Sequence, residues 1–139
     1  MANPHVRYVN PPSAPPVQGL YSHVARVKPG ELAFIAGQVA IDAQGNAVGV
    51  GDVGQQLVQV FANLKLLLSD LGADFEAVVQ FTTYLTRADH IAGFMAARSQ
   101  LFATAFPGGN YPPNTLLVVE RLVKPEFLVE VEAIARLPG

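Results

Sequence analysis

The sequence predicts an α+β fold with the element order β-β-α-β-α-β-β, and three observations lead to this prediction. Residues 52–71 and 89–103 place apolar side chains three and four residues apart, as one face of a helix does. Other stretches are rich in β-branched residues or alternate in polarity, as strands do. Glycine and proline separate these stretches. We therefore expect a mixed sheet that carries both helices on one face and meets a partner subunit with the other.

The N-terminal part is predicted to begin with an extended arm. Residues 1–18 include a proline-rich stretch, which cannot form a helix or a central strand because proline lacks an N–H donor. Residues 23–28 and 32–38 have the composition of strands, and Pro29-Gly30 between them predicts a hairpin turn.

The helix over residues 52–71 has clear start and stop signals. Asp52 is suited to cap its first turn, Gln55 stands three residues later as in a capping box, and Gly72 is suited to end the helix. Its predicted buried face consists of Val53, Leu57, Val60, Phe61, Leu64, Leu67, Leu68 and Leu71.

The second half is expected to place a helix between strands. Residues 77–85 alternate in polarity and predict a strand. The crossover through the helix at 89–103 implies some parallel pairing. Residues 115–122 and 127–135 predict two final strands that form a terminal hairpin. The residues expected along one side of the second helix are Ile91, Phe94, Met95, Arg98, Leu101 and Phe102.

The composition excludes several classes of protein. A chain of 139 residues fits one domain, and with 14% charged and 50% apolar residues it is expected to hide surface in a homo-oligomer. A net charge of −2 gives no basic footprint for nucleic acid or an anionic membrane. The absence of cysteine excludes disulfides and thiolate chemistry. We see neither a signal peptide nor a long apolar run, so we expect a cytoplasmic protein.

Two motif-like features are interpreted as structural. The segment from Gly49 to Gly54 has the form G-x-G-x-x-G, but no firm strand precedes it and no acidic residue ends the next strand. A dinucleotide site requires both, so we expect a loop and a helix cap. His5, His23 and His90 lie in separate elements, and their spacing predicts no metal site.

Glu130 and Glu132 are the strongest candidates for chemistry. In a strand their carboxylates lie on one face, about 7 Å apart, in a row with Leu128 and Ile134. Burial and like charge both raise a carboxyl pKa, which suits a general acid or base. The alternatives are a solvated face or a glutamate that pairs with an arginine at an interface.

Several segments of the sequence form one ordered pattern. They are Gly19-Leu20-Tyr21-Ser22, Phe34-Ile35-Ala36-Gly37-Gln38, Gly45, Gln56 with Asn63-Leu64, Leu71-Gly72-Ala73 and 129–135. From about Val17 to Ala135 this pattern resembles the RidA family, also called YjgF or endoribonuclease L-PSP. The resemblance implies a chorismate-mutase-like subunit that forms homotrimers, with ligand clefts between subunits. It also implies hydrolysis of reactive imines and enamines to keto acids and ammonia, without metal or cofactor.

In such a cleft an arginine clamps the substrate carboxylate, a tyrosine and backbone groups frame the ligand, and a glutamate handles water. By this resemblance Glu130 matches the catalytic glutamate, Tyr21 the tyrosine and Gly37 the backbone position. The other substrate-binding positions carried over are Ala36, Ile91, Asn114 and Leu116.

Asn114 stands where members of the family have their arginine. An asparagine offers a neutral amide in place of a charged, bidentate fork, so the substrate is expected to differ from 2-aminoacrylate. Arg26 or Arg98 could reach the cleft from elsewhere, or a neighbouring subunit could supply a cation. Arg121 has strand parity opposite to Asn114 and is expected to point away.

The sequence and its family resemblance lead to three hypotheses about function. The first is an imine or enamine hydrolase acting on a small metabolite. The second is a module of the same fold that binds a small ligand without turnover, since a fold does not fix a function. The third, an endoribonuclease, is disfavoured because RNA binding requires clustered basic and aromatic residues, and the nine lysines and arginines are dispersed.

Overall fold

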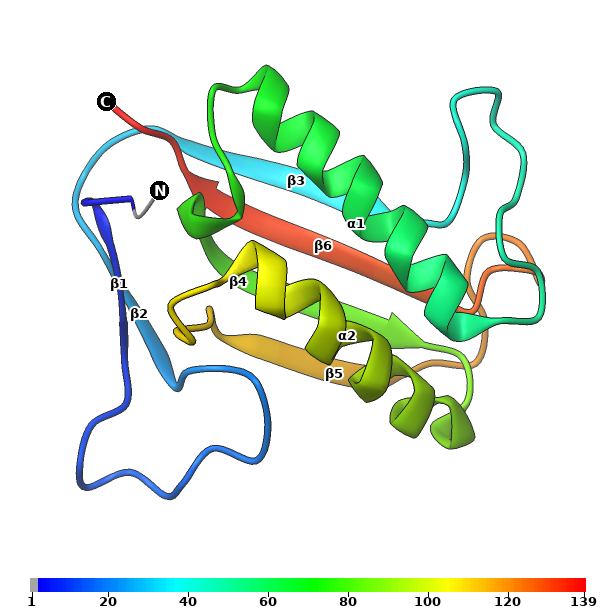
Figure 1. Ribbon diagram of the computed structural model, residues 1–139, viewed down its shortest axis with the longest axis horizontal. Coiled ribbons are helices and arrows are strands. Elements are labelled where there is room, and N and C mark those ends of the chain that lie inside the picture. The colour runs from blue at the N-terminus through cyan, green and yellow to red at the C-terminus, as the bar shows by residue number, and fades with distance from the viewer. Residues whose placement is uncertain (1–2) are drawn as a thin grey trace.

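The chain forms two sheets, and both long helices lie on one face of the larger sheet (Figure 1). The computed structural model describes residues 3–139. The larger sheet has the strand order β3-β6-β4-β5, and the smaller one pairs β1 with β2. The predicted α+β class and the placement of both helices are confirmed. The elements are β1 (Val6–Val9), β2 (Val24–Val27), β3 (Leu32–Gln38), α1 (Val53–Asp70), η1 (Phe75–Ala77), β4 (Val78–Leu85), η2 (Ala88–His90), α2 (Ile91–Ala105), β5 (Asn114–Val118) and β6 (Val129–Arg136).

The predicted hairpin between residues 23–28 and 32–38 is wrong. Strand β2 pairs antiparallel with β1, a strand inside the stretch expected to be an extended arm, whereas β3 pairs antiparallel with β6. The turn at Pro29 instead carries the chain from one sheet to the other. The guanidinium of Arg136 donates to the carbonyls of Lys28, at 3.0 Å, and Pro29, at 2.6 Å, and so fixes this connection.

The predicted terminal hairpin is also wrong. Strand β5 ends at Val118 and pairs parallel with β4, as the crossover through α2 requires. Strand β6 instead enters the sheet between β3 and β4, antiparallel to both. The reason is burial: alternate residues of β6 are fully covered by the helices, which favours a central position for this strand.

Helix α1 begins and ends where the sequence predicts. The Oδ1 atom of Asp52 accepts from the N–H of Gln55 at 3.1 Å, and Gly72 adopts a φ of 73° just past the helix. The predicted buried face is wrong at Leu67 and Leu71, which are exposed, because the sheet covers a narrower stripe than the apolar spacing suggests. On α2, Met95 is likewise exposed.

Two amide side chains on α1 bind the loops that flank the sheet. Gln56 is fully buried, donates to the carbonyl of Glu126 at 2.8 Å and accepts from the N–H of Leu128 at 2.8 Å. Asn63 donates to the carbonyls of Val39 and Ile41. These contacts hold the ends of β3 and β6, which carry Gly37 and Glu130.

The smaller sheet is attached to the larger one by a few specific contacts. The hydroxyl of Tyr8 donates to the carbonyl of Val78 at 2.6 Å, and its ring lies edge-on to Phe106 at 6.4 Å. Asn3 donates to the carbonyl of Arg136 at 2.9 Å. The core beside this contact is a cluster of aromatic rings formed by Phe61, Phe75, Phe81, Phe102, Phe106 and Tyr111.

Candidate functional site

Two glutamates of β6 lie on the face of the large sheet that the helices leave open. Side chains alternate along this strand: Val129 and Val131 are buried in the core, whereas Glu130 and Glu132 are half-buried on the opposite face. Strand pairing places Tyr84 opposite Glu130, and the Tyr84 hydroxyl donates to a carboxylate oxygen of Glu132. The open face therefore carries two carboxylates and a phenol side by side.

The two carboxylates differ in their hydrogen bonding. Burial raises the pKa of Glu130 above its usual range, and the negative charge of Glu132 adds to this rise. Glu132 accepts the hydroxyl of Tyr84, and this bond raises the pKa of the tyrosine. Glu130 is consequently the better proton acceptor for chemistry near neutral pH.

Glycine at position 37 lets the Glu130 carboxylate lie directly against the backbone of β3. A Cβ atom at this position would fall 2.0 Å from Oε2 of Glu130, much closer than any real contact. The approach occurs where the pairing of β3 with β6 shifts register between Ile35 and Gln38. Ala36 is exposed beside this irregularity. The sequence-predicted residues Ala36, Gly37 and Glu130 therefore lie together.

The predicted site residues on β5 and α2 lie on the helix-covered side of the sheet. Asn114 pairs with Phe81 in parallel register, and its Oδ1 accepts the hydroxyl of the buried Thr83 at 2.8 Å. Leu116 and Ile91 are half-buried and pack against the hydrophobic core. The side chain of Asn114 is thus on the helix-covered face of the sheet, opposite to that of Glu130.

Tyr21 lies in the loop between β1 and β2, next to α2. Its hydroxyl accepts from the N–H of Gln18 at 3.1 Å, and its ring lies edge-on to His23. A Cβ atom at Gly19 would lie 4.0 Å from the Tyr21 ring and 3.3 Å from Nη2 of Arg98. The loop thus places Tyr21 and a buried arginine of α2 around the same glycine.

Within one protomer the predicted site residues form two groups. Residues 36, 37 and 130 face the open side of the sheet, whereas Asn114, Leu116 and Ile91 lie on its helix-covered side. The strand register explains this separation, because Asn114 and Leu116 pair with the core residues Phe81 and Thr83, whereas Glu130 pairs with Tyr84 on the opposite face. Sequence reasoning did not single out Tyr84, because only the pairing of β4 with β6 brings it to the glutamates.

The remaining sequence features have ordinary structural roles. The segment from Gly49 to Gly54 forms a loop and the cap of α1, and Gly49 and Gly51 adopt positive φ values of 71° and 79°. Arg121 follows β5 and donates to the carbonyls of Leu122 and Val123. Within residues 3–139, no three histidine, aspartate or glutamate side chains form a metal-binding group. No helix in the same range is long and apolar enough to cross a membrane.

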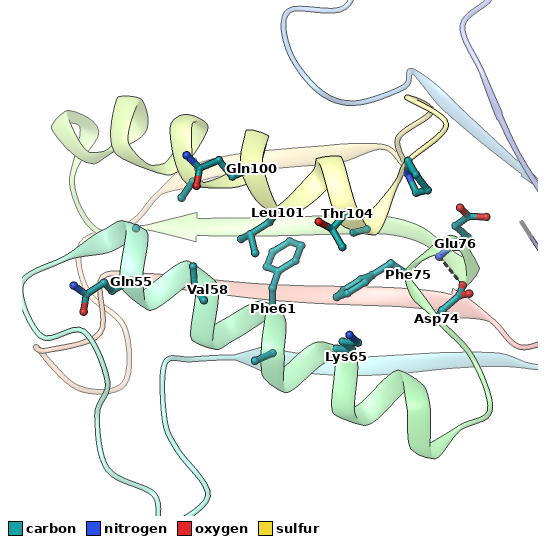
Figure 2. Close-up of a pocket in the computed structure, with 15 residues that line it drawn as sticks. Gln55, Val58, Phe61, Lys65, Asp74, Phe75, Glu76, Gln100, Leu101 and Thr104 are labelled. Atoms are coloured by element: carbon teal, nitrogen blue, oxygen red, sulfur yellow. Dashed lines mark hydrogen bonds between the residues drawn. The ribbon is translucent and has the colours of Figure 1, made fainter. Parts of the chain in front are cut away.

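A large groove runs between α1 and α2 (Figure 2). Phe61, Leu101 and Phe75 lie along it, and Lys65, Asp74 and Glu76 lie toward one end. None of the sequence-predicted site residues lines this groove. A smaller hollow on the open face adjoins Glu132 and is lined by Phe34, Ile35, Gln80, Thr82, Ala133 and Ile134.

Comparison with known proteins identifies the class to which this fold and these residues belong. Residues 11–137 match the family described as Endoribonuclease L-PSP. A Rid family protein of unknown function from Yersinia pestis, YyfB, is 35% identical, with a TM-score of 0.85 over 96% of this chain and 99% of its own. The chain belongs to this family, which also carries the names RidA and YjgF.

Two relatives known from their sequences extend the comparison. A RutC family protein of Pyrococcus abyssi is 34% identical over 122 residues, covering 88% of this chain and 90% of its own. A protein of Dermatophagoides farinae named 2-iminobutanoate/2-iminopropanoate deaminase is 23% identical over 84% of this chain and 94% of its own.

Proposed function

We propose that the protein hydrolyses a small imine or enamine to a carbonyl compound and ammonia, with Glu130 as the base. The observation that carries this proposal is the Glu130 carboxylate, which lies on the Gly37 backbone with its pKa raised by burial. Imine hydrolysis demands little more than a placed water and a proton acceptor. The relative from Dermatophagoides farinae named as an imine deaminase supports the same reaction class.

The proposed reaction balances with water as the other reactant. Glu130 takes a proton from water as the oxygen bonds to the imine carbon, and the C=N electron pair moves to nitrogen. Protonated Glu130 returns this proton to the nitrogen of the tetrahedral intermediate, which becomes an amine. The proton of the new hydroxyl group is then transferred through Glu130 to the same nitrogen as the C–N bond breaks. Ammonia leaves, a carbonyl forms, and Glu130 returns to its starting state. An enamine enters the same sequence after protonation at carbon gives the imine.

We propose further that the complete site forms between subunits of a homotrimer. One protomer presents Glu130 and Gly37 on its open face, while Asn114 and Leu116 belong to its covered face. A single cleft can hold both groups when one comes from each of two neighbouring chains. The exposed apolar side chains on the open face, Leu32, Phe34 and Leu117, support burial of this face by a partner.

The test is Glu130→Gln, which keeps the shape of the side chain and removes the proton acceptor. We expect ammonia release from freshly generated imines to fall by about 10²–10⁴-fold, the usual contribution of a general base. Glu132→Gln is the matched control, because it alters the neighbouring carboxylate whose partner is Tyr84. Size-exclusion chromatography checks that both variants keep the wild-type assembly. Unchanged turnover in Glu130→Gln would rule out the assignment.

A second function, ligand binding without turnover, is favoured by Asn114. Its Oδ1 is engaged by Thr83, and a neutral amide is a weaker anchor for a carboxylate than an arginine. This function predicts that ligands raise the melting temperature of the wild type while no imine in the panel is hydrolysed faster than in buffer. Asn114→Arg is assayed in parallel. If only this variant hydrolyses imines, the site lacks nothing but a carboxylate-binding arginine, and if neither protein does, the site is not catalytic.

A further inference from the structure

Arg98 is a buried arginine whose charge no carboxylate balances within residues 3–139. Its side chain is 3% exposed. The hydrogen bond it makes in this range goes from Nη2 to the sulfur of Met95, at 2.9 Å, and its buried Nε has no partner there. A thioether is a weak acceptor, whereas a guanidinium carries five N–H donors. Most of the donor capacity of Arg98 is therefore unused.

The surroundings of Arg98 stabilise a cation without satisfying its hydrogen bonds. The guanidinium carbon lies 5.1 Å from the ring centre of Phe94 and 5.7 Å from that of Phe102, distances at which aromatic faces attract a cation. Neither ring accepts a planar hydrogen bond. Burial lowers the pKa of Arg98, which expresses the cost of holding the charge away from water. A site of this kind is stabilised when an anion arrives.

The geometry of α2 places Arg98 near the group of predicted site residues that lies on the helix-covered face. Phe102 packs on Phe81 at 6.1 Å, and Phe81 pairs with Asn114. Helix α2 runs antiparallel to β4 and β5. Going back four residues, from Phe102 to Arg98, moves about 6 Å along the helix axis. In the strands the same distance corresponds to two residues toward the C-terminal end. Two residues beyond Phe81 and Asn114 lie Thr83 and Leu116, which pair with each other, so Arg98 lies over this pair.

The other neighbour of Arg98 is the loop that carries Tyr21. Nη2 of Arg98 lies 3.3 Å from where a Cβ atom of Gly19 would be, so a larger residue would crowd the guanidinium. Within the described residues, the hydrogen bonds of residues 10–22 join this loop to itself or to His23. The loop thus covers Arg98 by contact alone and leaves its donors to a ligand.

We propose that Arg98 is the anion-binding residue of the site and binds the carboxylate of a small 2-oxo or 2-imino acid. The charged contact then comes from α2 and not from β5. The identity of the imino acid rests on the proposed function. On this proposal the positive charge that the family resemblance would place at position 114 is supplied by Arg98. Asn114 then contacts the neutral part of the ligand. A planar guanidinium next to Tyr21 suits a planar carboxylate through two parallel N–H···O bonds.

The experiment is calorimetric titration of the purified protein with pyruvate, the simplest stable 2-oxo acid, and with its neutral amide, pyruvamide. The variants are Arg98→Met, which keeps length and apolar contact, and Arg98→Lys, which keeps charge without the fork. Arg26→Met is the matched control, because Arg26 is an exposed arginine of β2. We expect Arg98→Met to weaken pyruvate binding by about tenfold or more, with pyruvamide binding unchanged. Arg98→Lys should fall between, and Arg26→Met should match the wild type.

Thermal unfolding without ligand supplies the second measurement. If the charge awaits a ligand, Arg98→Met should unfold at the same or a higher temperature than the wild type, because it removes an unpaired buried charge. A lower melting temperature together with dissociation of the assembly would overturn the proposal and assign Arg98 to an ion pair with a neighbouring subunit. Equal pyruvate affinity in wild type and Arg98→Met, or no saturable pyruvate binding by the wild type, would also overturn it. Imine turnover by Glu130→Gln and pyruvate titration of Arg98→Met are separate measurements on separate variants, so loss of turnover and loss of anion binding remain distinguishable.

Discussion

The two faces of the large sheet differ in what covers them and in the side chains they carry. The helix-covered face is a continuous core of aliphatic and aromatic side chains, with Phe81 and Phe102 stacked at 6.1 Å. The open face combines Glu130, Glu132 and Tyr84 with the exposed Phe34. Because side chains alternate along a strand, each of the two glutamates is flanked along β6 by core residues on the other face. The core therefore fixes the positions of the acids without enclosing them.

The largest effect should come from the same substitution made on each face. Phe102→Ala opens a cavity in the aromatic cluster and should lower the free energy of unfolding by about 3–5 kcal/mol. Phe34→Ala, at a side chain 74% exposed, should leave the unfolding of the protomer nearly unchanged and weaken assembly. Urea unfolding and analytical ultracentrifugation measure the two effects. Equal losses of stability would show that the faces do not differ in this way.

A smaller but still large effect is expected at Gln56, which lies on α1 and binds the backbone that leads into β6. Gln56→Leu keeps the volume and removes two hydrogen bonds to the backbone before β6, together with a longer one to the carbonyl of Gly49 at 3.3 Å. The buried backbone groups that are left unpaired should lower the free energy of unfolding by about 1–3 kcal/mol. Urea unfolding should reveal this loss, and Gln100→Leu on exposed α2 surface is the control. Activity measured under conditions where the variant is still folded should also fall, since Glu130 follows Leu128 by two residues. An unchanged unfolding midpoint would contradict this role.

The smallest effect concerns pH. A carboxyl whose pKa is raised in the folded protein takes up protons on folding, so its contribution to stability is full at low pH and is lost as pH rises through the folded value. Glu130→Gln should therefore stabilise the protein more at pH 8 than at pH 4, while turnover in the wild type should rise with pH through the same pKa. Unfolding midpoints across pH measure the first expectation, with Glu120→Gln as an exposed control. A stabilisation by Glu130→Gln that is greater at pH 4 would contradict the assigned environment.

The sequence predicted local structure better than pairing, and particular residues explain why. Asp52 and Gly72 bound α1 because capping depends on neighbours in the chain. The partners of β2 and β6 were wrong because strand neighbours are chosen by tertiary burial, which adjacency in sequence does not express. Gln56 was missed as a buried residue because its hydrogen-bond partners lie about 70 positions away.

The candidate site was predictable in composition and not in arrangement. The alternation of 129–135 correctly placed Glu130 and Glu132 on one face. Arg98 was correctly expected on the same side of its helix as Phe94 and Phe102, but only the structure shows that it is buried there with no acid beside it among residues 3–139. Tyr84 joins Glu132 through strand pairing, for which no local signal exists.

The contact between Gly37 and Glu130 has a consequence for how mutations at position 37 would be read in a genetic screen. Any codon change that replaces Gly37 adds a Cβ atom, and that atom meets the Glu130 side chain from its carboxyl group to Cγ, so this side chain has to turn away. The φ of Gly37 is not positive, so the backbone itself tolerates other residues. A saturation library scored for cellular abundance should therefore find position 37 nearly neutral. On the proposed function, the same library scored for imine hydrolysis should find position 37 intolerant to every replacement. The gap between the two scores would measure the effect of displacing the Glu130 carboxylate.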